Sequence, residues 1–364
     1  MKKLAIVGKG TAGALALNHF CNYTDWEIDL YYDSSIEEQT VGEGTTLEIP
    51  RSLVDTIGMT WEDVRKLNGS VKTGIQYTGW SPSDYFHNFP LPYASMHVDA
   101  VKLQEHLIYM NEFTAIDKKV DVNNIDADYV IDCSGKPNDY TDYNLTSNIN
   151  VNAVCLMQFK PIKNIDHTLC IAMPNGWMFG IPLQNRISFG YLYNKDISIR
   201  QEVQVEMIEY LFKQGYKNPI VERQFDFKNY YHTKNFTENK SCNGNASFFL
   251  EPLEATSLAL VDKINRWTFD VINKNIDIKK ANSLYDEYVK QIEVVIGLHY
   301  LNPIHSSDFW DEAKKNSQFV YEHEEFKYIL QNLYNDNYFV NDFGTWTKDS
   351  FKQNIEGLSL NLSL

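Results

Sequence analysis

"KLAIVGKGTAG", residues 3–13, decides the fold of this chain. The stretch begins with an apolar run that predicts a buried strand over residues 3–7, and an apolar-periodic helix follows from about residue 11 to residue 21. The segment "EIDLYYD" (27–33) predicts a second strand. Strand, glycine turn, helix and strand in this order are the start of a doubly wound α/β sheet.

The turn has the glycine spacing of a dinucleotide-binding motif. The first glycine permits the tight turn, the second lets the backbone approach a pyrophosphate, and the third lets the helix pack closely on the strand. The N-terminus of the helix supplies donors to phosphate, and an acid at the end of the second strand can hold ribose hydroxyls. The predicted cofactor-binding residues here are Gly8, Gly10, Thr11, Ala12, Gly13 and Asp33. The motif alone leaves open whether the dinucleotide is FAD or NAD.

A later strand favours FAD. The segment "DADYVIDCSGKP" (126–137) predicts a buried strand that ends in a small-residue glycine turn. A strand of this kind recurs in FAD-binding oxidoreductases, on the adenosine side of the cofactor. Asp132 and Gly135 are therefore added to the predicted cofactor-binding residues.

Composition and charge argue against several classes of protein. The chain has 364 residues, of which 43% are hydrophobic, and its mean hydropathy is −0.39. No apolar run approaches the roughly 20 residues that span a bilayer. A net charge of −15 disfavours nucleic-acid binding. The five cysteines are scattered without a CxxC pair, which favours reduced thiols over disulfides or a zinc site. We expect a cytoplasmic globular protein with no metal, nucleic-acid or membrane partner.

The remaining periodicity predicts interleaved domains rather than two domains in series. Strand-like alternation dominates residues 150–195 and lies between segments of nucleotide-binding type. No low-complexity tract or obvious linker separates the parts. Helical patterns cover residues 52–67, 98–114, 200–214 and 256–296, and the clearest strands are at 128–135 and 186–194.

Four further blocks then appear in a fixed order: "VGEGTTLEIP" (41–50), "VKTGIQYTGW" (71–80), "GWMFGIPL" (176–183) and "GNASFFLEPLEATS" (244–257). Together with "GKGTAG", these blocks resemble the flavin-dependent halogenases of the tryptophan-halogenase type. The shorter pieces "GLHY" (297–300) and "DFW" (308–310) echo a later stretch of that family. The blocks are unrelated to each other except through one active site, so their combination is specific.

The chain departs from the family pattern in three ways. Phe179 replaces the second tryptophan of the family signature W-x-W-x-I-P, and Ser257 stands where the family usually has glycine beside the halide. The chain also looks much shorter than tryptophan halogenases, mostly toward the C-terminus. We therefore expect a more open substrate end than in those enzymes.

The resemblance implies two catalytic residues and a halide site. Lys72 would hydrogen-bond hypohalous acid or carry the halogen, and Glu254 would stabilise the halogenated ring and accept its proton. The backbone at Thr256 and Ser257, near a helix start, would bind the halide. The competing interpretations are a surface lysine and a glutamate that only stabilises a helix dipole.

The resemblance also implies the surroundings of these residues. Trp177, Phe179, Ile181 and Pro182 would form a dry wall between flavin and substrate, and His87 would line the substrate side. The flavin strap and the last cofactor block would add Gly42, Glu43, Gly44, Thr45 and Asn245. The implied domains are an FAD-dependent core over 1–310 (FAD-binding segments about 1–50, 98–140 and 240–296; β-rich substrate region about 70–97 and 150–235) and a shortened helical region over 311–364.

The function implied is halogenation of an electron-rich small aromatic substrate with FADH2, O2 and a halide. A separate NAD(P)H flavin reductase would supply FADH2. Because heavier halides are easier to oxidise, bromide or iodide should serve at least as well as chloride. Two alternatives stay open: a single-component FAD monooxygenase and a non-catalytic flavin-binding paralogue. The sequence leaves the native substrate and a homo-oligomeric state undecided.

Overall fold

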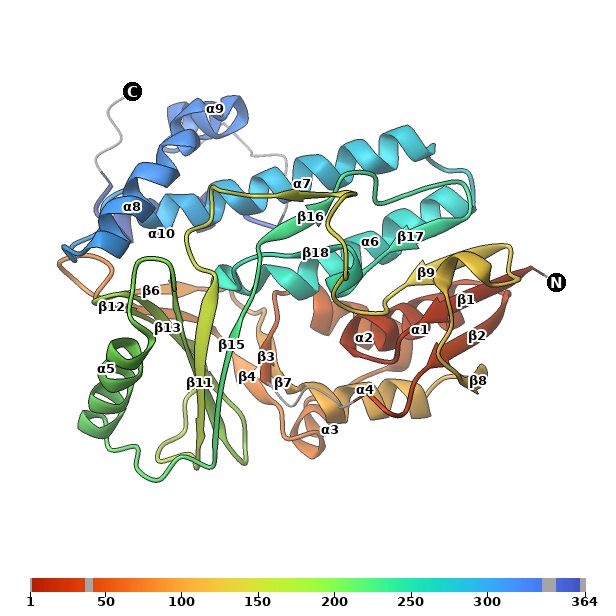
Figure 1. The fold of residues 1–364 in the computed structure, drawn as a ribbon, viewed down its shortest axis with the longest axis horizontal. Helices are drawn as coiled ribbons and strands as arrows, with labels where there is room; N and C mark the ends of the chain where they lie inside the picture. The colour runs from red at the N-terminus through yellow and green to blue at the C-terminus, as the bar shows by residue number, and fades with distance from the viewer. Residues whose placement is uncertain (1, 37–41, 336–344, 361–364) are drawn as a thin grey trace. The chain divides into compact units, whose positions relative to one another are not determined.

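The computed structural model describes residues 2–36, 42–335 and 345–360 of the chain. It divides into two compact units, each assembled from three separate stretches of sequence. Unit 1 comprises Met1–Gly69, Val98–Leu145 and Tyr230–Val289, and unit 2 comprises Ser70–His97, Thr146–Asn229 and Lys290–Leu364. The chain therefore passes from one unit to the other five times (Figure 1).

Unit 1 is built around a five-stranded sheet in the order β17-β9-β1-β2-β8. Every neighbouring pair runs parallel, and the central strand β1 pairs Lys3 with Glu27 and Leu4 with Tyr129. This confirms the predicted α/β fold class. The strands are β1 Lys3–Val7, β2 Glu27–Tyr32, β8 Thr114–Asp117, β9 Tyr129–Asp132 and β17 Lys240–Cys242.

Helix α1 (Thr11–Tyr23) packs on one face of this sheet, as Figure 1 shows. Its apolar side chains join those of β1, β2 and β9 in one core that includes Leu4, Leu17, Phe20 and Ile131. The opposite face carries Ala5, Val7 and Val130, which pack beneath side chains of residues 120–127. Because both faces of this parallel sheet are covered, its strands are near-continuous apolar runs in the sequence.

The other elements of unit 1 surround this core. The helices are α2 Glu48–Ile57, α3 Trp61–Lys66, α4 Ala100–Tyr109, α6 Thr256–Ile272 and the first part of α7 Ile278–Tyr300. Short elements are β3 Gly42–Gly44, η1 Val122–Asn124, β10 Tyr143–Leu145, β16 Tyr230–His232, η2 Gly244–Ala246, β18 Phe248–Phe249 and η3 Leu253–Ala255.

Three predicted helical segments need correction. Residues 256–296 are divided between α6 and α7, because residues 273–277 are not helical. Residues 52–67 are divided between α2 and α3, because Gly58 ends α2 in the left-handed region (φ 62°) and Thr60 starts α3 with a capping box. Residues 98–114 contain a helix only over α4, because the Asp99 side chain accepts a hydrogen bond from the Lys102 N–H and so caps its start. The residues at either end of that segment belong to strands.

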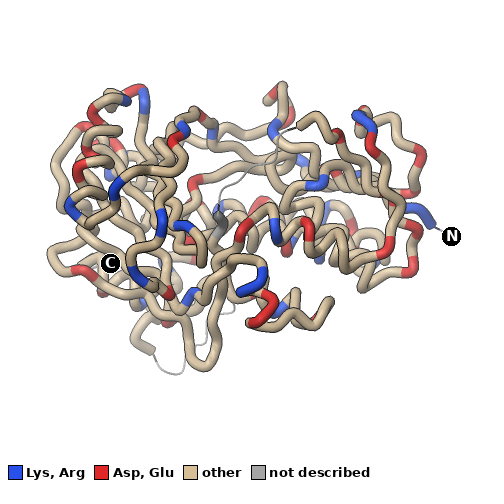
Figure 2. Tube along the Cα trace, turned by 90° about the horizontal axis from the view of Figure 1, so that it is seen from below, with Lys and Arg blue, Asp and Glu red and all other residues tan. Residues whose placement is uncertain are grey.

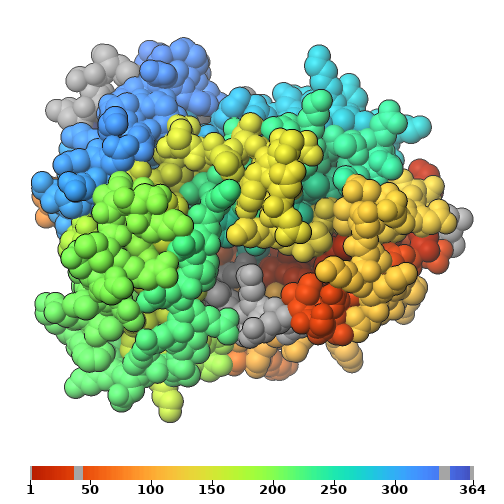
Figure 3. Space-filling model, viewed as in Figure 1, coloured from red at the N-terminus to blue at the C-terminus, as the bar shows by residue number. Residues whose placement is uncertain are grey.

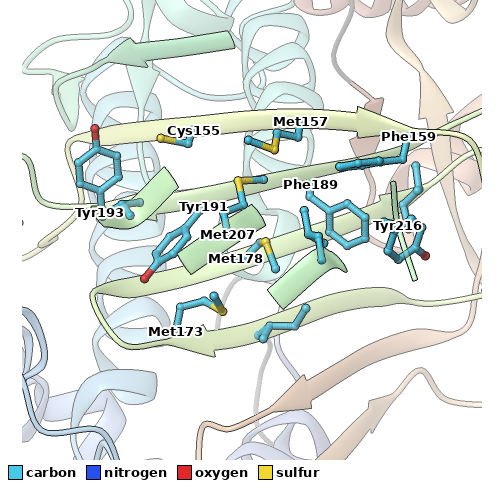
Figure 4. Close-up of a cluster of buried hydrophobic side chains, with 14 of the residues drawn as sticks. Cys155, Met157, Phe159, Met173, Met178, Phe189, Tyr191, Tyr193, Met207 and Tyr216 are labelled. Atoms are coloured by element: carbon cyan, nitrogen blue, oxygen red, sulfur yellow. The ribbon is translucent and has the colours of Figure 1, made fainter. Parts of the chain in front are cut away.

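Unit 2 contains a seven-stranded sheet in the order β15-β11-β14-β13-β12-β5-β6. Its pairs are antiparallel except β12 with β5. One face packs against α5 (Arg200–Lys213), where Met178 and Met207 lie in the buried cluster shown in Figure 4. The strands are β5 Gly74–Thr78, β6 Tyr85–Asn88, β11 Ala153–Phe159, β12 Thr168–Met173, β13 Gly176–Pro182, β14 Ile187–Tyr193 and β15 Val221–Asp226.

Helix α5 and strand β15 form part of the surface of unit 2, in green in Figure 3. A separate antiparallel pair joins β4 (Ser70–Lys72) to β7 (Ser95–Asp99). The rest of unit 2 is helical and comprises the end of α7, α8 Asp308–Asn316, η4 Ser317–Glu322, α9 Glu324–Asn332 and α10 Lys348–Gly357.

Helix α10 covers the edge strand β6. The Asn88 N–H donates to Gln353 Oε1 at 2.9 Å, and the Ser81 hydroxyl donates to the Gly357 carbonyl at 2.6 Å. A bare sheet edge exposes unpaired backbone groups, so this helix protects one end of the seven-stranded sheet.

Charged residues of both signs are scattered over the described chain (Figure 2). All five cysteines are free thiols. Within residues 2–36, 42–335 and 345–360, no helix has the length and apolarity to cross a membrane.

Candidate functional site

The residues predicted to bind a dinucleotide gather at one edge of the unit 1 sheet. Gly8 follows β1, Asp33 follows β2, Asp132 ends β9, and the segment with Asn245 follows β17. These strands are neighbours and run parallel, so their carboxyl ends share one edge. Ligands of open α/β sheets bind at this edge.

The three glycines of the turn have different surroundings. Gly8 has φ 107°, and a Cβ there would lie 2.2 Å from the Cys133 carbonyl oxygen. A Cβ on Gly13 would lie 1.8 Å from the carbonyl oxygen of Gly8. A Cβ on Gly10 would meet no described atom within 4 Å. The first and third glycines are therefore required by packing, whereas the second leaves open space at the start of α1.

The two strand-end carboxylates are held in local turns. The Ser35 hydroxyl and N–H donate to Asp33 Oδ1 at 2.5 and 3.0 Å, and these bonds hold the pKa of Asp33 below its usual value. The Ser134 N–H donates to Asp132 Oδ1 at 2.9 Å. Gly135 has φ 102°, which favours glycine at the turn after β9.

The last cofactor block lies against the start of α1. Gly244 has φ 57°, and a Cβ there would lie 2.5 Å from Ala12 Cβ, so the backbone of η2 approaches the helix closely. The buried Asn243 side chain accepts from the Gly244 N–H and donates to Asn265 Oδ1 at 2.8 Å. The predicted cofactor-binding residues Ala12 and Asn245 therefore lie close together.

Two other predicted cofactor regions can be located. Gln104 of α4 donates to the Thr11 hydroxyl at 3.0 Å. Gly42, Glu43 and Gly44 form β3, and the Thr45 side chain after it is fully buried. Val41, at the start of the strap block, lies outside the described residues.

Glu254 has an unusual backbone. Its side chain is 7% exposed, and both it (φ 66°) and Ala255 (φ 57°) adopt left-handed conformations. Left-handed backbone costs a non-glycine residue about 1–2 kcal/mol, and such conformations cluster at functional sites. Helix α6 begins directly afterwards with the predicted halide residues Thr256 and Ser257. The buried Glu251 lacks this backbone feature.

In unit 2, Lys72 is fully buried at the end of β4, opposite Ser95 of β7. Its Nζ lies 5.3 Å from the centroid of the Phe89 ring, within range of a cation–π interaction. The alternative interpretation of a solvent-exposed lysine is therefore wrong.

A buried histidine, His97, lies on β7 beside β4, the strand that carries Lys72. It was not identified from the sequence. The Ser70 hydroxyl donates to the Pro182 carbonyl at 2.6 Å, so its oxygen accepts from His97 Nδ1 at 3.1 Å. His97 Nε2 accepts from the Thr168 hydroxyl at 2.8 Å. Burial, followed by the positive charge of Lys72, holds the pKa of His97 far below its usual value. The neutral ring thus links β4 to β12, and the Ser70 hydroxyl links β4 to β13.

The predicted aromatic wall is divided between the two faces of β13. Trp177, Phe179 and Ile181 share the face opposite Met178, because side chains alternate along a strand. By the same alternation Pro182 belongs to the other face. The Phe179 ring lies across Gly190 of β14, where an added Cβ would be 2.2 Å from the ring.

His87 is 3% exposed, and its Nε2 lies 2.8 Å from the Ser350 hydroxyl of α10. Among the described residues, no group of three or more His, Cys, Asp or Glu side chains is arranged to hold a metal.

Comparison with known proteins agrees with this architecture. The family model described as tryptophan halogenase matches residues 3–118 and 112–361. The solved tryptophan halogenase from Shewanella frigidimarina NCIMB 400 is 19% identical, with a TM-score of 0.83 over 100% of this chain and 90% of that one. Xcc4156, a flavin-dependent halogenase from Xanthomonas campestris, is 17% identical, with a TM-score of 0.83 over 98% and 88%.

A tryptophan 6-halogenase from Streptomyces toxytricini is 16% identical, with a TM-score of 0.83 over 97% of this chain and 90% of that one. At these identities the structures show a shared fold, whereas the family model covers nearly the whole sequence. The chain belongs to the tryptophan halogenase family of flavin-dependent enzymes.

Proposed function

We propose that this protein uses FADH2, O2 and a halide to make hypohalous acid and halogenate electron-rich small aromatic molecules, with Lys72 and Glu254 as catalytic residues. A separate NAD(P)H flavin reductase supplies FADH2. The observation that carries the proposal is the complete burial of Lys72 in a strand pair beside an aromatic ring. Burial of an amine is costly, so a structural role alone gives little reason for it.

The cofactor site supports FAD. Open space at Gly10 leaves room for a pyrophosphate at the N-terminus of α1, where backbone N–H groups favour negative charge. Asp33, Asp132 and Asn245 lie at or shortly after the carboxyl ends of β2, β9 and β17, at the same edge of the sheet. Reduced FAD, when bound, supplies the electrons with which O2 becomes able to oxidise a halide.

The halide is held by the start of α6. The first N–H groups of a helix lack intrahelical partners and carry partial positive charge. Thr256 and Ser257 provide these groups directly after the left-handed pair Glu254 and Ala255. The Ser257 side chain also narrows a position that the family usually leaves to glycine, so we expect no selective chloride site.

Lys72 directs the halogen. As an ammonium it hydrogen-bonds hypohalous acid, and as a neutral amine it exchanges an N–H hydrogen for the halogen and releases water. In either form it delivers a halogen that is formally positive to the ring carbon. The neutral His97 on the neighbouring strand adds no competing positive charge to the site.

Glu254 completes the substitution. Once the halogen has bonded to a ring carbon, the ring is cationic until it loses the proton from that carbon. A carboxylate stabilises this cation and accepts the proton. The left-handed backbone at Glu254 and Ala255 fixes where the carboxylate projects.

Water exclusion favours halogenation over hydroxylation. Trp177, Phe179 and Ile181 offer an apolar surface on the face of β13 opposite α5. An apolar passage keeps hypohalous acid from being lost to water and separates the substrate from the flavin.

A screen tests this proposal. Electron-rich phenols, anilines and indoles are incubated with the protein, FAD, a flavin reductase, NADH and chloride, bromide or iodide, and products are read by mass spectrometry. We expect products with one halogen in place of one hydrogen. Hydroxylated products, or halide-independent consumption of NADPH by the protein in an assay without the reductase, would indicate a single-component monooxygenase. Tight flavin binding without turnover of any arene would indicate a non-catalytic paralogue.

A further inference from the structure

The segment 244–247, which contains η2 and Asn245, is held by tyrosine hydroxyls from distant parts of unit 1. Tyr230 donates to the Asn245 carbonyl at 2.8 Å, and Tyr143 donates to the Ala246 carbonyl at 2.6 Å. Tyr285 donates to the Ser247 carbonyl at 3.1 Å. Three consecutive carbonyls of this short segment therefore accept hydrogen bonds from tyrosine hydroxyls.

The tyrosines come from three different elements, and two of them contact each other. Tyr143 lies in β10 and Tyr230 in β16, which pair with each other, and their ring centroids are 5.4 Å apart in an edge-to-face arrangement. Tyr285 lies in α7 and is 1% exposed. Burial raises the pKa of each hydroxyl, so all three remain protonated donors over the whole working range of pH.

The other side of this segment faces the start of α1. Gly244 approaches Ala12 so closely that an added Cβ would lie 2.5 Å away. A trans peptide points its N–H opposite to its carbonyl, so a bond to the carbonyl also orients the next N–H. Hydrogen bonds from Tyr143 and Tyr230 thus set two peptide planes beside the glycine turn.

We propose that Tyr143 and Tyr230 are positioning residues for the flavin: their hydroxyls hold segment 244–247 in the orientation that receives the cofactor at the N-terminus of α1. The inference rests on the proposed FAD site, because it assigns these residues a role in shaping that site. Neither hydroxyl need touch the cofactor, since each acts through the peptide group that it holds.

The test is calorimetric titration of FAD into the full chain. The variants are Tyr143→Phe, Tyr230→Phe and the double variant, which remove only hydroxyls. Tyr191→Phe is the control, because Tyr191 is a fully buried tyrosine of unit 2, where its hydroxyl donates to Glu206 Oε2 at 2.6 Å. Thermal unfolding without cofactor and the visible absorption of bound flavin are measured for each protein.

We expect FAD affinity to fall roughly tenfold in the double variant and less in each single one, the order expected for two lost hydrogen bonds of ordinary strength. The absorption of the bound flavin should change in these variants alone. Tyr191→Phe should lower thermal stability and leave FAD affinity within about twofold.

Two results would overturn the inference: unchanged affinity and absorption in the double variant, or an equal loss of affinity in Tyr191→Phe. If the double variant fails to fold, the single variants decide by the same criteria. Failure of the wild-type protein to bind FAD is a different result, because it refutes the proposed function from which the inference starts.

Discussion

Replacing His19 with leucine should make the stability of the protein less sensitive to acid. His19 lies on α1, the helix that begins at the glycine turn. His19 is 7% exposed on α1, and its ring centroid lies 4.8 Å from that of Tyr23 and 6.0 Å from that of Phe269 on α6. Burial, and then the positive charge of Arg266, lower the pKa of His19 from 6.5 to about 4. The folded protein therefore keeps this ring neutral at pH values where the unfolded chain protonates it.

The magnitude follows from this pKa difference. The difference between 6.5 and about 4, at 1.36 kcal/mol per pKa unit, corresponds to about 3 kcal/mol of unfolding free energy. Because the folded-state pKa of His19 is depressed, this stability is fully present above pH 6.5 and is lost as the pH falls toward 4. At pH 4.5 the loss from this one group is about 2–3 kcal/mol.

Urea unfolding of wild type and His19→Leu, followed by circular dichroism, measures the effect. Other carboxylates titrate in the same range, but they contribute equally to both proteins and cancel in the difference. Between pH 7.5 and pH 4.5 the stability difference should move by about 2–3 kcal/mol in favour of the variant. Between pH 7.5 and pH 9 it should stay constant, which is the internal control. A difference that does not change between pH 7.5 and 4.5 would refute the buried neutral histidine.

Three further predictions concern the proposed chemistry. Lys72→Ala should abolish halogenated product in the mass-spectrometric assay while oxidation of FADH2 by O2 continues, because the lysine acts after O2 has reacted; halogenation near the wild-type rate would contradict its role. Gly10→Val should fold normally, since its Cβ side meets no described atom within 4 Å, yet lose FAD affinity in calorimetry. Gly13→Ala, which would force a Cβ to 1.8 Å from a carbonyl oxygen, should instead lower the thermal unfolding temperature. With equal concentrations of the three halides, bromide and iodide should be incorporated at least as well as chloride, and strongly preferred chlorination would contradict this expectation.

The first part of unit 1 could be predicted from the sequence because its signals are local. The strand at 3–7 has the observed bounds of β1, and the helix after it runs two residues beyond the predicted end. Glycine spacing carries this information, since the close contacts of Gly8 and Gly13 occur within the turn itself or with its neighbouring strand. Gly58 instead ends a helix, and the helical pattern over residues 52–67 did not reveal the boundary that it makes between α2 and α3.

The supporting residues of the site could not be predicted, because their partners are distant in sequence. His97 lies 71 residues from Thr168, and Tyr143 lies 103 residues from Ala246. No periodicity within one element indicates such contacts. The left-handed backbone at Glu254 and Ala255 was also hidden, because neither residue is a glycine or an asparagine.

The parallel sheet of unit 1 also has a consequence for synthesis on the ribosome. Its strand β9 is complete at Asp132, but the strand that covers its outer edge, β17, ends only at Cys242. At about 5–20 residues per second, the ribosome needs roughly 5 to 20 seconds to make the residues between them. During that interval the nascent chain exposes an unpaired, apolar strand edge, which invites association with other chains. Heterologous production should therefore give more soluble protein at a low inducer concentration, where few nascent chains are present at once, and with a chaperone that shields strand edges. Strong expression of the same chain should give less soluble protein.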